Sequence, residues 1–138
     1  ELQTAIRDLG IADRVIQTGP RSDVADLLSA FDVYVHLPLY QEPFPGVVLE
    51  ALAMERAVVA YDSSGIGEQF EPGRSGLLIP QGDVEAVAKA LADLFREPHR
   101  RIAMGKQGRE FLLSHFSLER HFRELEQVYE ELKSKGKT

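Results

Sequence analysis

Short runs of apolar and β-branched residues recur along the chain, and they constrain its fold more than any other feature. The four runs are "RVIQTG" (14–19), "VYVHL" (33–37), "AVVAYD" (57–62) and "GLLIP" (76–80). Strands of this length that lack strict polar alternation are typical of a parallel sheet with helices on both faces. We therefore predict an α/β fold with a doubly wound, Rossmann-like parallel sheet of four strands.

Helical patterns separate these runs. In the segment 22–32, Val24, Leu27, Leu28 and Phe31 fall on one helical stripe, with Ser22 available as the N-cap. Further helices are expected over 1–10, near 47–56, from the cap Asp83 to about 97–99, and over about 100–115.

A last helix, capped by Ser117, is predicted at the C-terminal end. Its apolar side chains share one face, and we expect this stripe to be core packing. The stripe comprises Leu118, Phe122, Leu125, Val128, Tyr129 and Leu132.

Composition excludes several function classes. The chain has 138 residues, enough for a single domain over 1–138, and a net charge of −6 without a basic stripe, so nucleic acid is not an expected partner. Without cysteine, disulfides and thiolate metal sites are excluded, and no run approaches the roughly 20 apolar residues of a transmembrane segment. We expect a cytoplasmic protein.

The segment "LYQEPFPGVVLEALAME" (39–55) is the main candidate site. Glu42 and Glu50 are separated by seven residues that include the Pro45-Gly46 break, and Glu50 is expected in the first turn of the following helix. No Ser, Thr, Asp or Asn precedes that helix, so its first N–H groups are free to bind an anion, and Gly46 allows close approach.

A phosphate would be repelled by the two glutamates, which should instead accept hydrogen bonds from hydroxyls. A ligand with a diphosphate between two polyols fits this pattern, which describes a nucleotide sugar. The spacing alone leaves another interpretation open, in which Glu50 is stabilised by the helix dipole without a ligand and Glu42 is a solvated loop carboxylate.

These residues resemble the C-terminal, donor-binding half of retaining GT-B glycosyltransferases of the group 1, or family 4, type. Four features occur in the family's order over 32–83: the E-x7-E pair Glu42 and Glu50, the strand "AVVAYD", "SGIGE" (64–68) and "GLLIPQGD" (76–83). Together with "RVIQTG" and the C-terminal Phe116-Ser117 segment, the resemblance extends over essentially the whole chain.

The resemblance implies a role for each matching residue. Glu42 is the implied catalytic residue, contacting the donor sugar, and Glu50 would bind the ribose hydroxyls. The backbone from Phe44 through Pro45 and Gly46 to Val47 would hold the diphosphate. The loop carrying Thr18, Gly19 and Arg21 would lie near the nucleobase.

Four places depart from the family pattern. Leu37-Pro38 stands where the family usually has Pro-Ser, Pro45 removes one possible amide donor, Ser64 replaces a glycine, and Glu55 replaces a glycine that would end the helix. Neither a cofactor nor a metal is expected, because helix amides and basic residues would take the place of a cation. Arg21, Arg56 and Arg74 are candidates for that charge, although each can equally be an ordinary surface arginine.

The resemblance also implies partners outside these residues: an N-terminal domain of the same enzyme that binds a still unknown acceptor, and further strands upstream. The last helix would cross onto that domain, which would also allow peripheral contact with a membrane. We expect the 138 residues alone to be inactive in transfer. Two alternatives stay open, a non-catalytic nucleotide-binding, phosphate-binding or protein-interaction module, and a sugar-nucleotide epimerase of the same fold.

Overall fold

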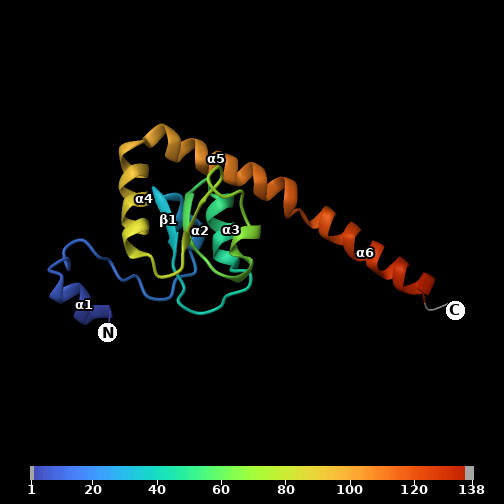
Figure 1. Cartoon of the computed structure of the whole chain (residues 1–138), viewed down its shortest axis with the longest axis horizontal. Helices are drawn as coiled ribbons and strands as arrows, with labels where there is room; N and C mark the ends of the chain where they lie inside the picture. Colours follow the sequence, from blue (N-terminus) through green and yellow to red (C-terminus); the bar gives the residue numbers. More distant parts are fainter. Residues whose placement is uncertain (1, 136–138) are drawn as a thin grey trace.

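The fold is an α/β arrangement around a three-stranded parallel sheet, as a computed structural model describes it for residues 2–135 (Figure 1). The strands are adjacent in chain order, β1-β2-β3, with Val35 opposite Val59 and Ala60 opposite Leu78. They are β1 (Val33–His36), β2 (Ala57–Asp62) and β3 (Leu77–Pro80). The predicted parallel, Rossmann-like architecture is confirmed, with one strand fewer than expected.

The strand predicted over 14–19 is wrong. This segment lies in an exposed stretch between α1 (Leu2–Asp8) and α2 (Val24–Ser29), and Ile16 is 88% exposed. In Figure 1 the stretch loops out beside the sheet without joining it. A β-branched run forms a strand only beside a neighbour that supplies hydrogen bonds and packing, and within residues 2–135 no strand pairs with it.

Helices cover both faces of the sheet. On one face, α2, α3 (Gly46–Ala53) and the 3₁₀ turn η1 (Ser64–Glu68) enclose a core around Leu52, Val58 and Phe70. On the other face, α4 (Val84–Arg96) and the first half of α5 (Pro98–His115) enclose Val59, Leu94 and Met104. The central strand β2 is buried from Ala57 to Tyr61, which explains its unbroken apolar sequence.

Helix capping follows the sequence at two of three predicted positions. Asp83 accepts a hydrogen bond from the Ala86 N–H at 2.9 Å, and Ser117 accepts one from the Arg120 N–H at 3.2 Å. Ser22, however, does not cap α2. The helix begins at Val24, one residue later than a cap at Ser22 requires, so Asp23 occupies the N-cap position. The Asp23 carboxylate makes no hydrogen bond to the helix and is bound to the Arg21 side chain instead.

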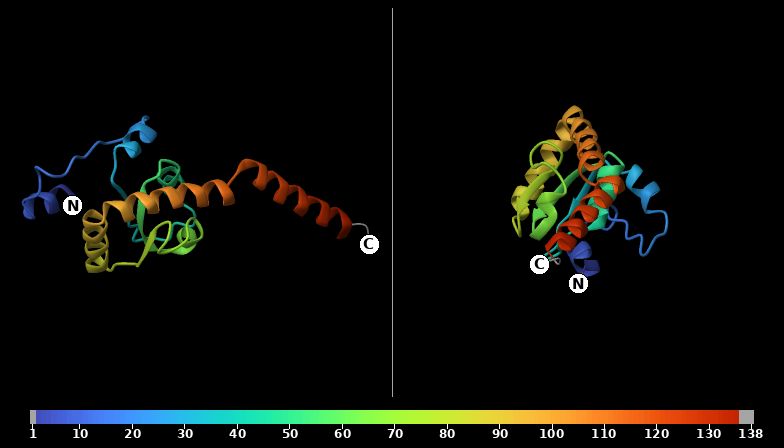
Figure 2. Two further views of the ribbon diagram at one scale, coloured as in Figure 1. Left: turned by 90° about the horizontal axis from the view of Figure 1, so that it is seen from above. Right: turned by 90° about the vertical axis from the view of Figure 1, so that its right-hand side faces the viewer.

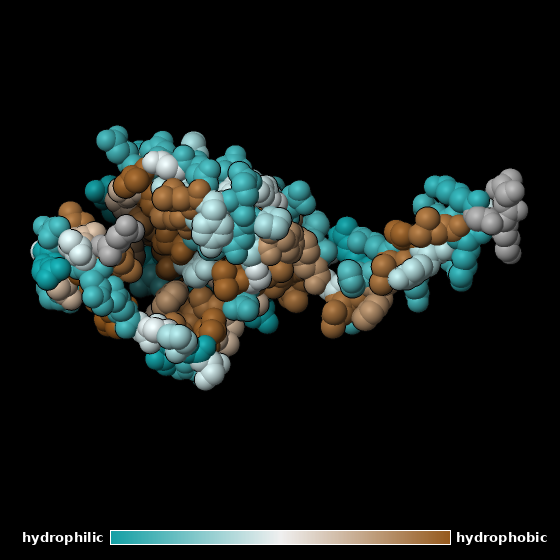
Figure 3. All heavy atoms as spheres, turned by 90° about the horizontal axis from the view of Figure 1, so that it is seen from below, coloured by the Kyte–Doolittle hydropathy of each residue, from teal (hydrophilic) through white to brown (hydrophobic). Residues whose placement is uncertain are grey.

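The C-terminal helix α6 (Leu118–Lys135) extends away from the rest of the molecule (Figures 1 and 2). Its apolar stripe is exposed, with Leu118 at 70% and Phe122 at 59%, and it forms a hydrophobic band along the projecting helix in Figure 3. The prediction that this stripe is core packing is therefore wrong for the described residues. The spacing correctly indicated one apolar face, but no element within 2–135 covers it.

None of the helices described within residues 2–135 combines the length and apolar character that crossing a membrane requires.

Candidate functional site

The N-terminal end of α3 is open and has no side-chain cap. Pro45 occupies the N-cap position in an extended conformation, and the Val48 N–H donates to the Pro45 carbonyl at 3.2 Å. The N–H groups of Gly46 and Val47 donate to no acceptor among the described residues. A methyl group built on Gly46 meets no atom within 4 Å, so the backbone is open to solvent on that side of Gly46. The arrangement can bind an anion.

Glu42 is held by a histidine from the neighbouring strand. The His36 Nε2 and the Glu42 Oε2 lie 3.0 Å apart, and the side chains are 14% and 30% exposed, respectively. The His36 ring in turn stacks on Tyr34, with centroids 6.3 Å apart and planes 16° apart. The contact fixes one carboxylate oxygen and leaves the other available for a ligand. His36 thereby orients Glu42.

Both glutamates act on the same phenol. Burial raises the pKa of Tyr34 above its ordinary value, and the negative charges of Glu42 and then Glu50 raise this pKa further. Since a charge acts appreciably only at short range, both carboxylates are expected near the Tyr34 phenol, Glu42 from the loop and Glu50 from α3.

This arrangement predicts a measurable titration. Glu42→Gln and Glu50→Gln should each lower the pKa of Tyr34 toward its ordinary value, while burial keeps it raised. The matched control Glu126→Gln on α6 should leave it unchanged. The pKa can be followed by NMR of ¹³C-labelled tyrosine rings, with Tyr34 assigned through Tyr34→Phe. A response to only one of the two site variants would show that the carboxylates do not share this environment.

The raised pKa also fixes a direction for stability. Because the folded state favours the neutral Tyr34 phenol, its contribution is fully present below the ordinary tyrosine pKa of about 10 and is lost as the pH rises through the higher folded-state value.

The loop that carries Glu42 rests on η1. A methyl group built on Gly65 would lie 2.0 Å from the Pro43 carbonyl oxygen, so only glycine allows this approach. The Ser64 hydroxyl donates to the Gln41 side chain, and the Gln69 amide donates to the Pro45 carbonyl at 3.0 Å. The "SGIGE" segment thus supports the loop, and Ser64, at φ +45°, adopts the left-handed conformation that usually favours glycine.

Glu50 lies in the second turn of α3, not in the first turn as predicted, because the helix already begins at Gly46. The attraction between a carboxylate and the helix dipole falls off within the first turn. It is therefore weaker at Glu50 than the interpretation without a ligand requires. Glu50 also lines a hollow of about 310 Å³ between α2 and α3. The other lining residues are mostly apolar: Ser22, Val24, Ala25, Leu28, Ala53 and Met54.

Thr18, Gly19 and Arg21 lie in the exposed segment before α2. The Thr18 hydroxyl donates to the Gly19 carbonyl at 3.2 Å, and the Arg21 Nε donates to Asp23 at 2.7 Å. This bond holds the pKa of the Asp23 carboxyl below its usual value. No described hydrogen bond joins these residues to the 42–50 segment. The next residue in the chain, Ser22, links them to the site, because it lines the same hollow as Glu50.

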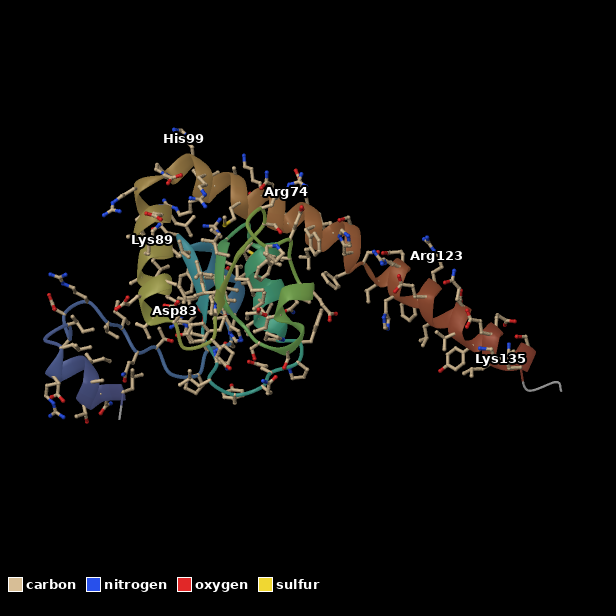
Figure 4. All side chains as sticks on the ribbon, viewed as in Figure 1. Arg74, Asp83, Lys89, His99, Arg123 and Lys135 are labelled. Atoms are coloured by element: carbon tan, nitrogen blue, oxygen red, sulfur yellow. The ribbon has the colours of Figure 1, made fainter. Side chains whose placement is uncertain are left out.

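The other candidate cations lie away from the open end of α3. Arg56 donates to the Met54 carbonyl at 2.6 Å and to the Phe31 carbonyl at 2.7 Å, at the amino end of the sheet. Arg74 pairs with Glu71 and is placed beside α5 in Figure 4, on the far side from the loop before α3. Among the described residues, no three His, Asp or Glu side chains form a potential metal site.

Three supporting residues were missed in the sequence. Tyr34 could have been found, because it lies two positions before His36 and so faces the same side of β1. Gly65 lies in the "SGIGE" segment already singled out, but the contact that it makes with the loop, like that of Gln69, has no local signal because the partner lies more than 20 residues away. The Gln69 side chain is fully buried, and its Oε1 lacks a partner among the described atoms.

A Rossmann-like sheet with an open helix terminus at its carboxyl end defines the class of α/β proteins that bind ligands at this edge. The family model of glycosyl transferases group 1 matches residues 1–111. The chain belongs to the group 1 glycosyl transferases.

Individual relatives agree with this assignment. The D-inositol 3-phosphate glycosyltransferase of Corynebacterium kroppenstedtii is 36% identical over 138 residues, covering 99% of this chain and 30% of the relative. Among solved structures, Anabaena HepE in complex with UDP has a TM-score of 0.85 at 26% identity, covering 96% of this chain and 36% of HepE. The sucrose-phosphate synthase of Thermosynechococcus elongatus has the same TM-score at 30% identity, with coverages of 96% and 34%. The chain thus spans about a third of the length of these relatives.

Proposed function

We propose that this chain binds the nucleotide-diphospho-sugar donor of a glycosyltransferase, at the open end of α3 between Glu42 and Glu50. The observation that carries the proposal is the pair of amides at Gly46 and Val47, which are unpaired among the described residues and lie between Glu42 and Glu50 in the chain. The solved structures of HepE with UDP and with UDP-glucose support it, because their folds match this chain over 96% of its length.

Each part of the site has a chemical role in this proposal. The Gly46 and Val47 amides and the positive end of the α3 dipole hold the diphosphate and stabilise its charge as it leaves. Glu50 accepts hydrogen bonds from the ribose hydroxyls, and the adjoining hollow takes the nucleobase. Glu42, oriented by His36, contacts the hydroxyls of the sugar and holds its ring while the glycosidic bond breaks.

We further propose that transfer by the whole protein retains the anomeric configuration and uses no metal ion. The amides supply the electrostatic stabilisation that a cation would otherwise provide.

The proposal is tested by ligand-dependent thermal unfolding of the 138-residue chain. A nucleotide sugar that binds only the folded state raises the melting temperature, by an amount equivalent to about 2.7 kcal/mol at a concentration 100 times its Kd. UDP-glucose, GDP-mannose and ADP-glucose form a suitable panel. Protection by one of them supports donor binding, whereas no protection by any would favour the interaction-module alternative, for which the exposed stripe of α6 offers a surface.

Gly46→Ala should separate binding from folding. The added methyl group meets nothing in the protein, and Gly46 has no left-handed conformation, so the melting temperature should be unchanged or slightly higher. In the proposed complex the ligand approaches the Gly46 backbone closely, so the added methyl group should obstruct it, and we expect nucleotide-sugar binding to weaken at least tenfold, measured by calorimetry. Unchanged affinity in a normally folded Gly46→Ala would argue against a ligand at this terminus.

A further inference from the structure

The side chain of Phe44 connects the donor-binding loop to a distant part of the chain. Its ring centroid lies 5.6 Å from that of Phe116, with the planes at 65°, which is the edge-to-face arrangement that aromatic pairs prefer. Phe116 is the C-cap residue of α5, directly after His115, and it immediately precedes Ser117, the cap of α6. The contact therefore joins the loop to the elbow between the last two helices.

Phe116 is itself fixed in position. Its N–H donates to the Leu112 carbonyl at 2.9 Å, and its ring lies 6.1 Å from that of Phe111. Phe111 stacks on His115, with centroids 4.0 Å apart. Phe116 is thus the last member of an aromatic row along α5, and this row provides a firm surface for Phe44.

On its other side, Phe44 approaches η1. Its Cδ2 lies 3.6 Å from the position of a methyl group built on Gly65, next to the tight contact between Gly65 and Pro43. Phe44 is nevertheless 43% exposed, so it is not anchored by burial in the main core. Its position depends on these two flanking contacts, of which Phe116 is the aromatic one.

We propose that Phe116 is a positioning residue for the donor site. By holding Phe44, it fixes the direction of the backbone two residues later, where the Gly46 and Val47 amides meet the diphosphate. This inference rests on the proposed function. Loss of the contact lets the loop sample other conformations, and a ligand must then order it at the expense of affinity.

The inference can be tested with variants at the elbow. Phe116→Ala should weaken binding of the tightest of UDP, GDP and ADP about three- to tenfold in calorimetry, and Phe116→Tyr, which keeps the ring, should restore it. The matched control Phe122→Ala removes a ring that is 59% exposed on α6 and should change nothing. Adding Phe44→Ala to Phe116→Ala should cause little further loss, because both remove the same contact.

A readout without ligand completes the test. In the free chain, Phe116→Ala should shift or broaden the amide NMR signals of Gly46 and Val47, whereas Phe122→Ala should not. If the wild type binds a nucleotide and Phe116→Ala binds it equally well, the inference is overturned and the proposed function stands. If the wild type binds none of the three, the proposed function fails and the inference fails with it.

Discussion

The Glu50→Gln variant is expected to bind nucleoside diphosphates and nucleotide sugars about 10- to 100-fold more weakly than the wild type. The carboxylate can accept a charge-assisted hydrogen bond from each of two ribose hydroxyls, and each such bond contributes about 1.5–3 kcal/mol. Glutamine retains one acceptor oxygen but no charge. Glu50 is exposed and glutamine is a good helix former, so the unfolding temperature without ligand should not change. Calorimetry and thermal protection both measure the loss.

The ligand itself supplies the sharpest control. If Glu50 contacts the ribose hydroxyls, a 2′-deoxynucleotide should bind the wild type more weakly than the ribonucleotide, and Glu50→Gln should discriminate less between the two. Glu126→Gln makes the same charge change on the projecting helix α6 and should leave both affinities unaltered. Equal losses for the ribose and deoxyribose ligands would place the role of Glu50 elsewhere.

The sequence predicts those parts of the fold whose neighbours are also encoded nearby. The strand over 57–62 is found at its predicted residues because an apolar run at the centre of a sheet has only one environment that suits it. The run 14–19 and the stripe of α6 have equally clear apolar patterns, yet both are exposed. A pattern indicates that side chains favour burial, but it does not identify the surface that buries them.

The candidate site shows the same division. Glu42, Gly46 and Glu50 are identified by local chemistry, because an uncapped helix terminus and two nearby carboxylates are visible in one short segment. The residues that support this segment are distant in the sequence and approach it only in the folded chain. Gln69 and Phe116 look like an ordinary polar residue and an ordinary core residue until the loop is folded against them.

The close packing of α5 on the end of α3 underlies the second large effect, expected for Gly105→Ala. A methyl group at this position would lie 2.0 Å from the Glu55 carbonyl oxygen and 2.7 Å from its carbonyl carbon. The backbone there has little freedom, since Glu55 adopts φ +57° and donates to Leu52 while Arg56 donates to Ala51, the paired bonds of a Schellman motif. The helix α5 must therefore move outward.

We expect Gly105→Ala to lower the free energy of unfolding by about 2 kcal/mol, which is an overpacking cost of about 3 kcal/mol less about 1 kcal/mol gained from the helix propensity of alanine. The corresponding fall in melting temperature is about 5–10 °C.

Gly108→Ala is the matched comparison on the same helix. Its methyl group meets mainly the Leu52 Cδ2 at 2.6 Å, the end of a flexible side chain, so it should cost less. The reverse order of stabilities would show that α5 is not fixed by its contact with Glu55. Because Phe116 directly follows α5, a folded Gly105→Ala should bind nucleotides more weakly as well, which would link the packing of this helix to the proposed donor site.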